Sequence, residues 1–167
     1  MQANFMEELV AEWFEYRGYI VKRNERVERL PSGGYKGELD VVAFNPKTNH
    51  LIHIETAVYG ASWAYYESKY KKKFEAGAKH IKALFGGLNL PNKIEKRVIL
   101  AGGSTKNHKT IGGGEIQLVE DFILEILKEL KSTSMLSRSV PEKYPVLRVL
   151  QMITQHRKKV VEELKER

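Results

Sequence analysis

The sequence predicts an α/β fold: a mixed central sheet flanked by helices, with a C-terminal helical extension. Two observations support this prediction. The first is the order of elements, which runs helix, three β-prone segments, long helix, two further β-prone segments and helix. The second is their spacing, because a loop and a short turn join the first three β-prone segments and a helix of residues 62–84 precedes the fourth. Short turns join antiparallel strands and a crossover helix joins parallel ones, so we expect both kinds of pairing.

The chain is expected to begin with a helix over residues 4–17 and a strand over 19–27. One face of the helix is apolar at helical spacing: Phe5, Met6, Leu9, Val10, Trp13 and Phe14. Gly18 follows in the position where glycine ends many helices. A Pro-Ser-Gly-Gly segment at 31–34 is typical of a loop, so the first strand is expected to end before it.

A β-hairpin is predicted next. Residues 38–44 (ELDVVAF) and 50–58 (HLIHIETAV) are both rich in β-branched and apolar side chains. The segment NPKTN at 45–49 lies between them and has the residue types of a turn. The two runs are therefore expected to pair as antiparallel neighbours.

The remaining chain continues the alternation of helices and strands. The expected elements are a helix at 62–84, a buried strand at 97–101, a glycine-rich loop at 102–114, a strand at 116–119, a helix at 120–131, a polar linker at 132–139 and a helix at 144–166. We expect residues 1–131 to form one domain, and residues 132–167 to form a linker and a helix that packs on it or extends it.

The amino-acid composition limits the kinds of metal ligand, cellular location and binding partner to be expected. The 167 residues include no cysteine, so any metal must be held by oxygen or imidazole, and a reducing, cytoplasmic location is expected. The N-terminus is acidic where a signal peptide is basic, and no apolar run reaches the roughly 18 residues that span a membrane. A net charge of +7 favours a polyanionic partner such as nucleic acid, although a protein can also be basic without binding one.

Two acidic residues of the predicted hairpin are candidates for a metal site. Strand alternation places three residues on one face of the first run: Lys36, Glu38 and Asp40. It places three on one face of the second: His53, Glu55 and Ala57. If the turn forms, Asp40 and Glu55 converge, and two adjacent carboxylates repel unless a cation lies between them. A hard divalent cation such as Mg²⁺ suits such oxygen ligands.

These residues resemble a known superfamily. Gly37-Glu38-Leu39-Asp40, an apolar run, a turn and then Leu51-Ile52-His53-Ile54-Glu55 are similar to the core motif of the PD-(D/E)XK nucleases, in the branch that contains Holliday-junction resolvases. That branch also has a helical Glu eleven residues before a Gly that opens the first strand, and Glu7 stands eleven residues before Gly18. The resemblance covers roughly residues 4–60 by motif, and about 95–131 by the order of elements.

The resemblance implies a restriction endonuclease-like αβββαβ core and a Mg²⁺- or Mn²⁺-dependent endonuclease that hydrolyses DNA phosphodiester bonds. It makes Asp40 and Glu55 metal ligands and Glu7 a supplementary acid, with Glu8 as the substitute if the helix is rotated. It also implies duplex or branched DNA as the partner and allows a homodimer, for which the apolar helix at 141–156 is one candidate surface.

One residue departs from the family pattern. The motif lysine is expected two residues after Glu55, where this chain has Ala57, either by nature or by engineering. Lys36, on the face of Asp40, or Lys69, on the next helix, are the two candidates for the missing amine. The alternative is a catalytically impaired module that binds DNA or a protein partner without cleavage. A third reading is a nuclease that acts on RNA.

Basic residues away from the motif are candidates for contact with the nucleic acid: Lys69, Lys71, Lys72, Lys73, Lys106 and Lys109. Four aromatic residues are interleaved with the first lysine run and are expected to contact the backbone or unstacked bases: Tyr65, Tyr66, Tyr70 and Phe74. A plain solvated helix face is the alternative for this run. His53 and His108 are equally consistent with structural positions, and the glycine-rich loop around His108 with a simple connection.

Overall fold

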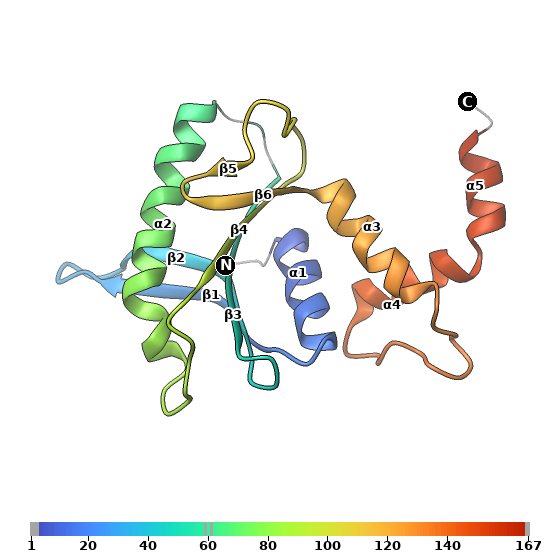
Figure 1. Cartoon of the computed structure of the whole chain (residues 1–167), viewed down its shortest axis with the longest axis horizontal. Helices are drawn as coiled ribbons and strands as arrows, with labels where there is room; N and C mark the ends of the chain where they lie inside the picture. Colours follow the sequence, from blue (N-terminus) through green and yellow to red (C-terminus); the bar gives the residue numbers. More distant parts are fainter. Residues whose placement is uncertain (1–3, 59, 61, 166–167) are drawn as a thin grey trace. The chain divides into compact units, whose positions relative to one another are not determined.

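The computed structural model describes residues 4–58, 60 and 62–165. These residues form five helices and a mixed six-stranded sheet (Figure 1). The helices are α1 (Phe5–Tyr16), α2 (Trp63–Leu84), α3 (Val119–Leu130), α4 (Pro145–Gln155) and α5 (Arg157–Lys165). The strands are β1 (Ile20–Arg29), β2 (Tyr35–Asn45), β3 (His50–Ala57), β4 (Glu95–Leu100), β5 (Thr110–Ile111) and β6 (Gly114–Leu118).

The sheet has the order β1-β2-β3-β4-β6-β5, which confirms the predicted mixture of parallel and antiparallel pairs. Strands β1, β2 and β3 form an antiparallel meander, β3, β4 and β6 are parallel, and β5 is antiparallel to β6. Helix α2 is the crossover that joins the parallel strands β3 and β4. The three central parallel strands therefore end at the same edge of the sheet.

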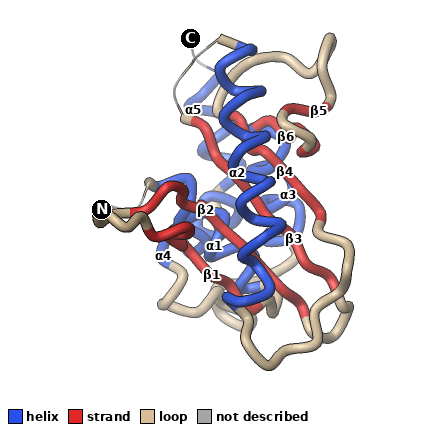
Figure 2. The backbone as a smooth tube through the Cα atoms, turned by 90° about the vertical axis from the view of Figure 1, so that its left-hand side faces the viewer, coloured by secondary structure: helices blue, strands red, loops and turns tan. Residues whose placement is uncertain are grey.

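Helices α1 and α2 cover opposite faces of the meander (Figures 1 and 2). The N-terminus of α1 is fixed by a capping box between Asn4 and Glu7, the third residue of the helix. The Asn4 side chain accepts a hydrogen bond from Glu7 N–H, and the Glu7 side chain accepts one from Asn4 N–H. The Ser62 hydroxyl caps α2 by accepting from Tyr65 N–H. Both caps lie beside the same end of β2 and β3, where the candidate site is found.

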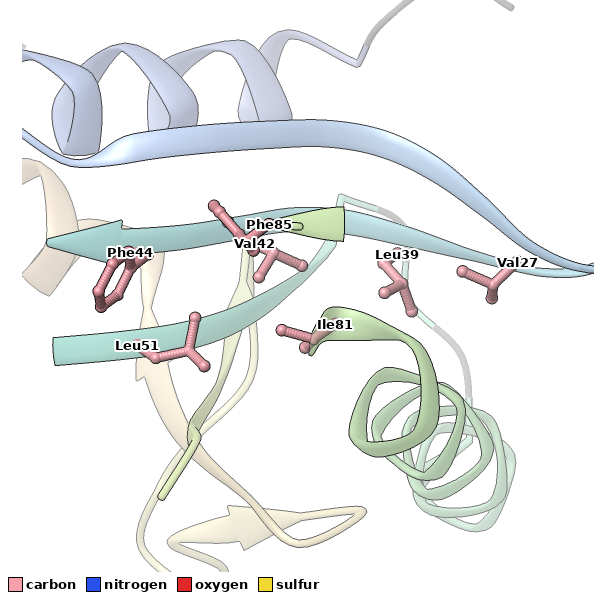
Figure 3. Close-up of a cluster of buried hydrophobic side chains, with 7 residues drawn as sticks. All are labelled: Val27, Leu39, Val42, Phe44, Leu51, Ile81 and Phe85. Atoms are coloured by element: carbon pink, nitrogen blue, oxygen red, sulfur yellow. The ribbon is translucent and has the colours of Figure 1, made fainter. Parts of the chain in front are cut away.

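The core between the sheet and α2 shows that β2 is not a regular strand near Asp40. This cluster consists of Val27, Leu39, Val42, Phe44, Leu51, Ile81 and Phe85 (Figure 3). Leu39 and Val42 both point toward α2, although residues three apart on a regular strand face opposite sides. Counting by twos from Asp40 therefore fails to predict where Lys36 points.

The second half of the chain differs from the prediction in two places. The glycine-rich loop contains the short strand β5, which two residues cannot signal in a sequence. The expected helix over 144–166 is two helices, α4 and α5, separated at His156; residue 166 lies outside the described residues. Two side-chain bonds lie at the break: the Thr154 hydroxyl donates to Gln151 O, and the Arg157 guanidinium donates to Thr154 O. Bonds of this kind slightly destabilise and often bend a helix.

The contacts divide the chain into two compact units, residues 1–119 and 120–167. The division comes one helix earlier than the boundary at residue 131 expected from the sequence. In the second unit, the buried Gln151 of α4 binds the segment that follows α3, since its amide donates to Thr133 Oγ1 and to Arg138 O. In the described part of the chain, no helix combines the length and the apolar character needed to cross a membrane.

Candidate active site

Asp40 and Glu55 come together where β2 and β3 separate. The ladder between these strands ends at the pair Val41–Ile54, and Asp40 and Glu55 are the next residues on each strand. Asp40 Oδ2 accepts from Thr56 N–H at 2.9 Å and from the Thr56 hydroxyl at 3.3 Å. Both side chains are almost fully buried, at 6% exposure for Asp40 and 0% for Glu55.

The cation between these carboxylates is the ammonium group of Lys73, from α2. Its Nζ donates to Asp40 Oδ1 and to Glu55 Oε2, and 18% of the side chain is exposed. Burial alone would lower the pKa of Lys73, but the charges of Glu55 and Asp40 outweigh it and raise that pKa. The lysine is therefore a charged group held at the centre of the site.

His53 supports Glu55 from the side opposite to Lys73. Its Nε2 lies 2.7 Å from Glu55 Oε1, and only 1% of the side chain is exposed. His53 Nδ1 has no hydrogen-bond partner among the described residues. A proton on Nδ1 would be buried without an acceptor, so the hydrogen of the bond to Glu55 is assigned to Nε2. The imidazole thereby holds the orientation of the Glu55 carboxylate.

The surroundings of Glu55 raise the pKa of its carboxyl group, and burial is the main cause. Complete burial raises the pKa of its carboxyl group, and the hydrogen bond from His53 lowers it again. The charge of Asp40 raises this pKa further, whereas the charge of Lys73 opposes the rise. Removal of His53 or of Lys73 should consequently favour the protonated acid, because both groups lower this pKa.

Glu7 borders the same site from α1. A cavity of about 540 Å³ opens beside Asp40, and its lining includes Glu7, Glu38, Lys69 and Lys73. Partial burial raises the pKa of Glu7, and the negative charge of Asp40 raises it further. The alternative acid, Glu8, is bound to the Arg23 guanidinium at 2.6 Å instead. Glu7 is therefore the helical acid that faces Asp40.

Comparison with known proteins assigns no family. No family model matches the chain, and no curated protein matches it. A crystal structure of a protein of unknown function, AF1548, aligns over 95% of this chain and 98% of its own, with 14% sequence identity and a TM-score of 0.47. A likeness at this level carries no information on activity.

The sequence suggested two lysines for the amine, and the structure places one of them away from the carboxylates and the other in the wall of the adjoining cavity. Lys36 Nζ is 2.9 Å from Glu28, and most of its side chain is exposed. Lys69 lines the carboxylate cavity, and its ammonium lies 5.4 Å from the centre of the Tyr70 ring. Lys73 is four residues after Lys69, on the same face of α2 and one turn deeper. Lys73 could have been predicted from the sequence, because residues four apart on a helix share a face and Lys69 was already a candidate.

The predicted nucleic-acid contacts divide into surface and core residues. Lys71, Lys72, Lys106 and Lys109 are exposed, whereas Lys73 belongs to the carboxylate site. Of the four interleaved aromatic residues, Tyr70 and Phe74 are 0% and 1% exposed, so they cannot receive a base. Tyr65 and Tyr66 line the carboxylate cavity.

The glycine-rich loop is attached to α2. Gly112 N–H donates to the Glu67 carboxylate at 2.8 Å, and His108 stacks on Trp63 with ring centres 4.0 Å apart. The Gly112 N–H is therefore used to hold the loop against α2.

Proposed function

We propose that this chain is a metal-dependent endonuclease of the PD-(D/E)XK type that hydrolyses DNA phosphodiester bonds. The order α1-β1-β2-β3-α2-β4 is the element order of the proposed αβββαβ core. The observation that carries the proposal is the position of Lys73, whose ammonium contacts both Asp40 and Glu55. This amine takes the place of the motif lysine, which is absent because residue 57 is alanine.

The residues present fit a divalent cation. Asp40 and Glu55 bear two negative charges against the single charge of Lys73, and the pKa of Glu7 is raised partly by the charge of Asp40. Among the described residues no cluster of three or more His, Cys, Asp or Glu side chains is arranged around a point. In this proposal Mg²⁺ or Mn²⁺ would be held by Asp40 and Glu55 with water completing its shell, as Mg²⁺ commonly is.

Each side chain has a distinct role in this proposal. A divalent cation bound here would supply an activated water and neutralise charge on the phosphate. Lys73 would release one carboxylate and direct its Nζ–H groups toward a phosphate oxygen or the attacking water. His53 would hold Glu55 through Nε2–H, and Thr56 N–H would hold Asp40. Glu7 would contribute negative charge from the cavity wall.

The competing reading is a module that binds DNA or a protein without cleaving. It relied on the absence of a lysine at position 57. An amine that reaches the same carboxylates from α2 removes that reason, so the enzyme is the better supported of the two.

Moving the lysine from position 73 to position 57 tests the proposal. Wild type, Lys73→Ala and the double variant Lys73→Ala with Ala57→Lys are incubated with supercoiled and branched DNA in Mg²⁺ or Mn²⁺. We expect Lys73→Ala to lower the nicking rate by about 10²-fold or more, the usual effect of losing a group that acts on the transferred proton. The double variant should recover part of the rate, because residue 57 lies two positions after Glu55 on the same strand.

Two controls accompany this assay. Lys82→Ala removes an exposed lysine of the same helix that is not among the predicted nucleic-acid contacts, and it should leave the rate nearly unchanged. Asp40→Ala should reduce cleavage to background. Equal cleavage by wild type and Asp40→Ala would remove the carboxylates from the reaction and contradict the proposal. Structured RNA in the same assay distinguishes a ribonuclease.

A further inference from the structure

A second cavity lies at the carboxyl ends of the parallel strands β3 and β4. Its volume is about 400 Å³, and its lining includes Trp63, Tyr66, Leu100 and the backbone of Gly102, Gly103 and Ser104. The crevice outside the carboxyl ends of parallel strands is where open α/β sheets most often bind ligands. This location alone makes the cavity a candidate ligand site.

The second cavity adjoins the carboxylate cavity. Ala57, Val58, Gly60 and Tyr66 line both of them. One ligand can therefore place a group in each cavity by passing this shared wall.

The two cavities differ sharply in chemistry. The carboxylate cavity is lined by the charged residues Glu7, Glu38, Asp40, Lys69 and Lys73. None of the described residues that line the second cavity carries a charged side chain. Its aromatic side chains can stack on a flat ring of a ligand. The peptide groups of its two adjacent glycines, Gly102 and Gly103, can hydrogen-bond to the edge of that ring.

The two aromatic rings are fixed before any ligand arrives. Tyr66 stacks on the buried Tyr70, with ring centres 5.5 Å apart and planes 15° apart. Trp63 stacks on His108 with planes 20° apart. The loop that carries His108 also bears the exposed Lys106 and Lys109, which can hold a phosphate backbone nearby.

We propose that this aromatic cavity binds the base of an unpaired nucleotide whose phosphate occupies the carboxylate cavity. The inference rests on the proposed function, because that function supplies the phosphate. A base inside an intact duplex is stacked on both sides and cannot enter, so the substrate is a nucleic acid with an unstacked nucleotide: a single strand, a branch point or a flipped base.

Binding without divalent cations tests this inference, since it requires no cleavage. The probes are a labelled single-stranded DNA of about 16 nucleotides, within the range covered by single-strand-binding folds, the blunt duplex of the same sequence, and a single strand with abasic sites. We expect Trp63→Ala to weaken binding of the single strand about fivefold or more while duplex binding is unchanged, and Trp63→Phe to retain most of the affinity.

Intrinsic fluorescence gives a second readout. The chain has two tryptophans, and Trp13 is fully buried in α1. The single strand should quench the fluorescence of wild type, whereas the abasic strand should not. Trp63→Phe leaves Trp13 alone and should abolish the quenching.

The outcomes separate this inference from the proposed function. Equal losses for single strand and duplex, or no loss in Trp63→Ala, would overturn the base cavity even if Asp40-dependent cleavage is found. Trp63-dependent binding of the single strand, with no cleavage in any metal, would support the cavity and contradict the nuclease.

Discussion

The imidazole of His53 lies directly against Gly77 of α2. A methyl group in place of the Gly77 hydrogen would come within 2.7 Å of His53 Cε1 and closer still to Nδ1. Real side-chain carbons do not approach so closely. The glycine therefore leaves room for the imidazole that orients Glu55.

We predict that Gly77→Ala destabilises the fold although it improves a helix. In an exposed helix interior, alanine is about 1 kcal/mol more favourable than glycine. At this position the methyl group must displace the buried imidazole, and overpacking of a core costs about 1–3 kcal/mol. We expect a net loss in the free energy of unfolding, measured by urea denaturation, together with lower cleavage because Glu55 loses its partner.

Two comparisons identify the cause of that loss. In a His53→Ala background the imidazole is absent, so Gly77→Ala should become neutral or stabilising. Gly86→Ala, after α2, meets its nearest atom at 3.8 Å and should change stability little. A stabilised Gly77→Ala single variant would show that the helix tolerates the methyl group and that His53 moves without cost.

Most of the fold could be read from local patterns. The spacing of apolar residues in α1 and the turn between β2 and β3 are encoded within a few residues, and both elements appear where expected. Strand β5 was missed because Thr110 and Ile111 are extended only through pairing with β6. The break at His156 was missed because apolar spacing continues across it, although the side-chain bonds of Thr154 and Arg157 lie there.

The sequence predicted the two carboxylates of the candidate site but not the amine between them, for a physical reason. Asp40 and Glu55 meet through hairpin pairing, which strand periodicity can anticipate. Lys73 reaches them from a helix, and its approach depends on how α2 crosses the sheet, which no local pattern specifies. Lys36 was a candidate because of regular strand alternation, which the shared side of Leu39 and Val42 shows to be interrupted.

A second prediction concerns Gln151 in the C-terminal unit. This residue is 0% exposed, and its Oε1 accepts from Val140 N–H at 2.9 Å while its Nε2 donates to Thr133 Oγ1 and Arg138 O. Gln151→Leu leaves the buried Val140 N–H without its acceptor, at about 1–3 kcal/mol for such an unpaired group. Hydrogen exchange should increase across residues 133–151. Gln155→Leu, at an exposed neighbour, is the control and should cause little change.

A third prediction uses two adjacent glycines with the same backbone strain. Gly112 and Gly113 have φ of +57° and +84°, so alanine is strained at either position. A Cβ on Gly112 would lie 2.6 Å from Tyr70 C, whereas a Cβ on Gly113 has nothing within 4 Å. Gly112→Ala should therefore lower the melting temperature more than Gly113→Ala. Equal shifts would show that strain alone matters and that the loop can move off α2.

The last prediction concerns the charge that Lys73 contributes. Its folded-state pKa is raised, so its pairing stabilises the fold at all pH values below the unfolded pKa and is lost as the pH rises through the folded one. Lys73→Met leaves two buried carboxylates facing each other, and loss of one partner from a buried ion pair typically costs about 3–5 kcal/mol. We expect a loss of this order in the free energy of unfolding at neutral pH.

The dependence of that loss on pH and metal tests the origin of the effect. Without Lys73 the folded-state pKa of Glu55 rises further, so the folded state of the variant binds protons more readily and gains stability relative to wild type as the pH falls from about 7.5 to about 5. Mn²⁺ should replace the missing cation and raise the melting temperature of Lys73→Met more than that of wild type, because a ligand that binds only the folded state stabilises it. Lys72→Met, which removes an exposed lysine, is the matched control and should show neither response. If Lys73→Met and Lys72→Met melted alike at both pH values, with and without Mn²⁺, the ammonium group would not be the charge that holds these carboxylates together.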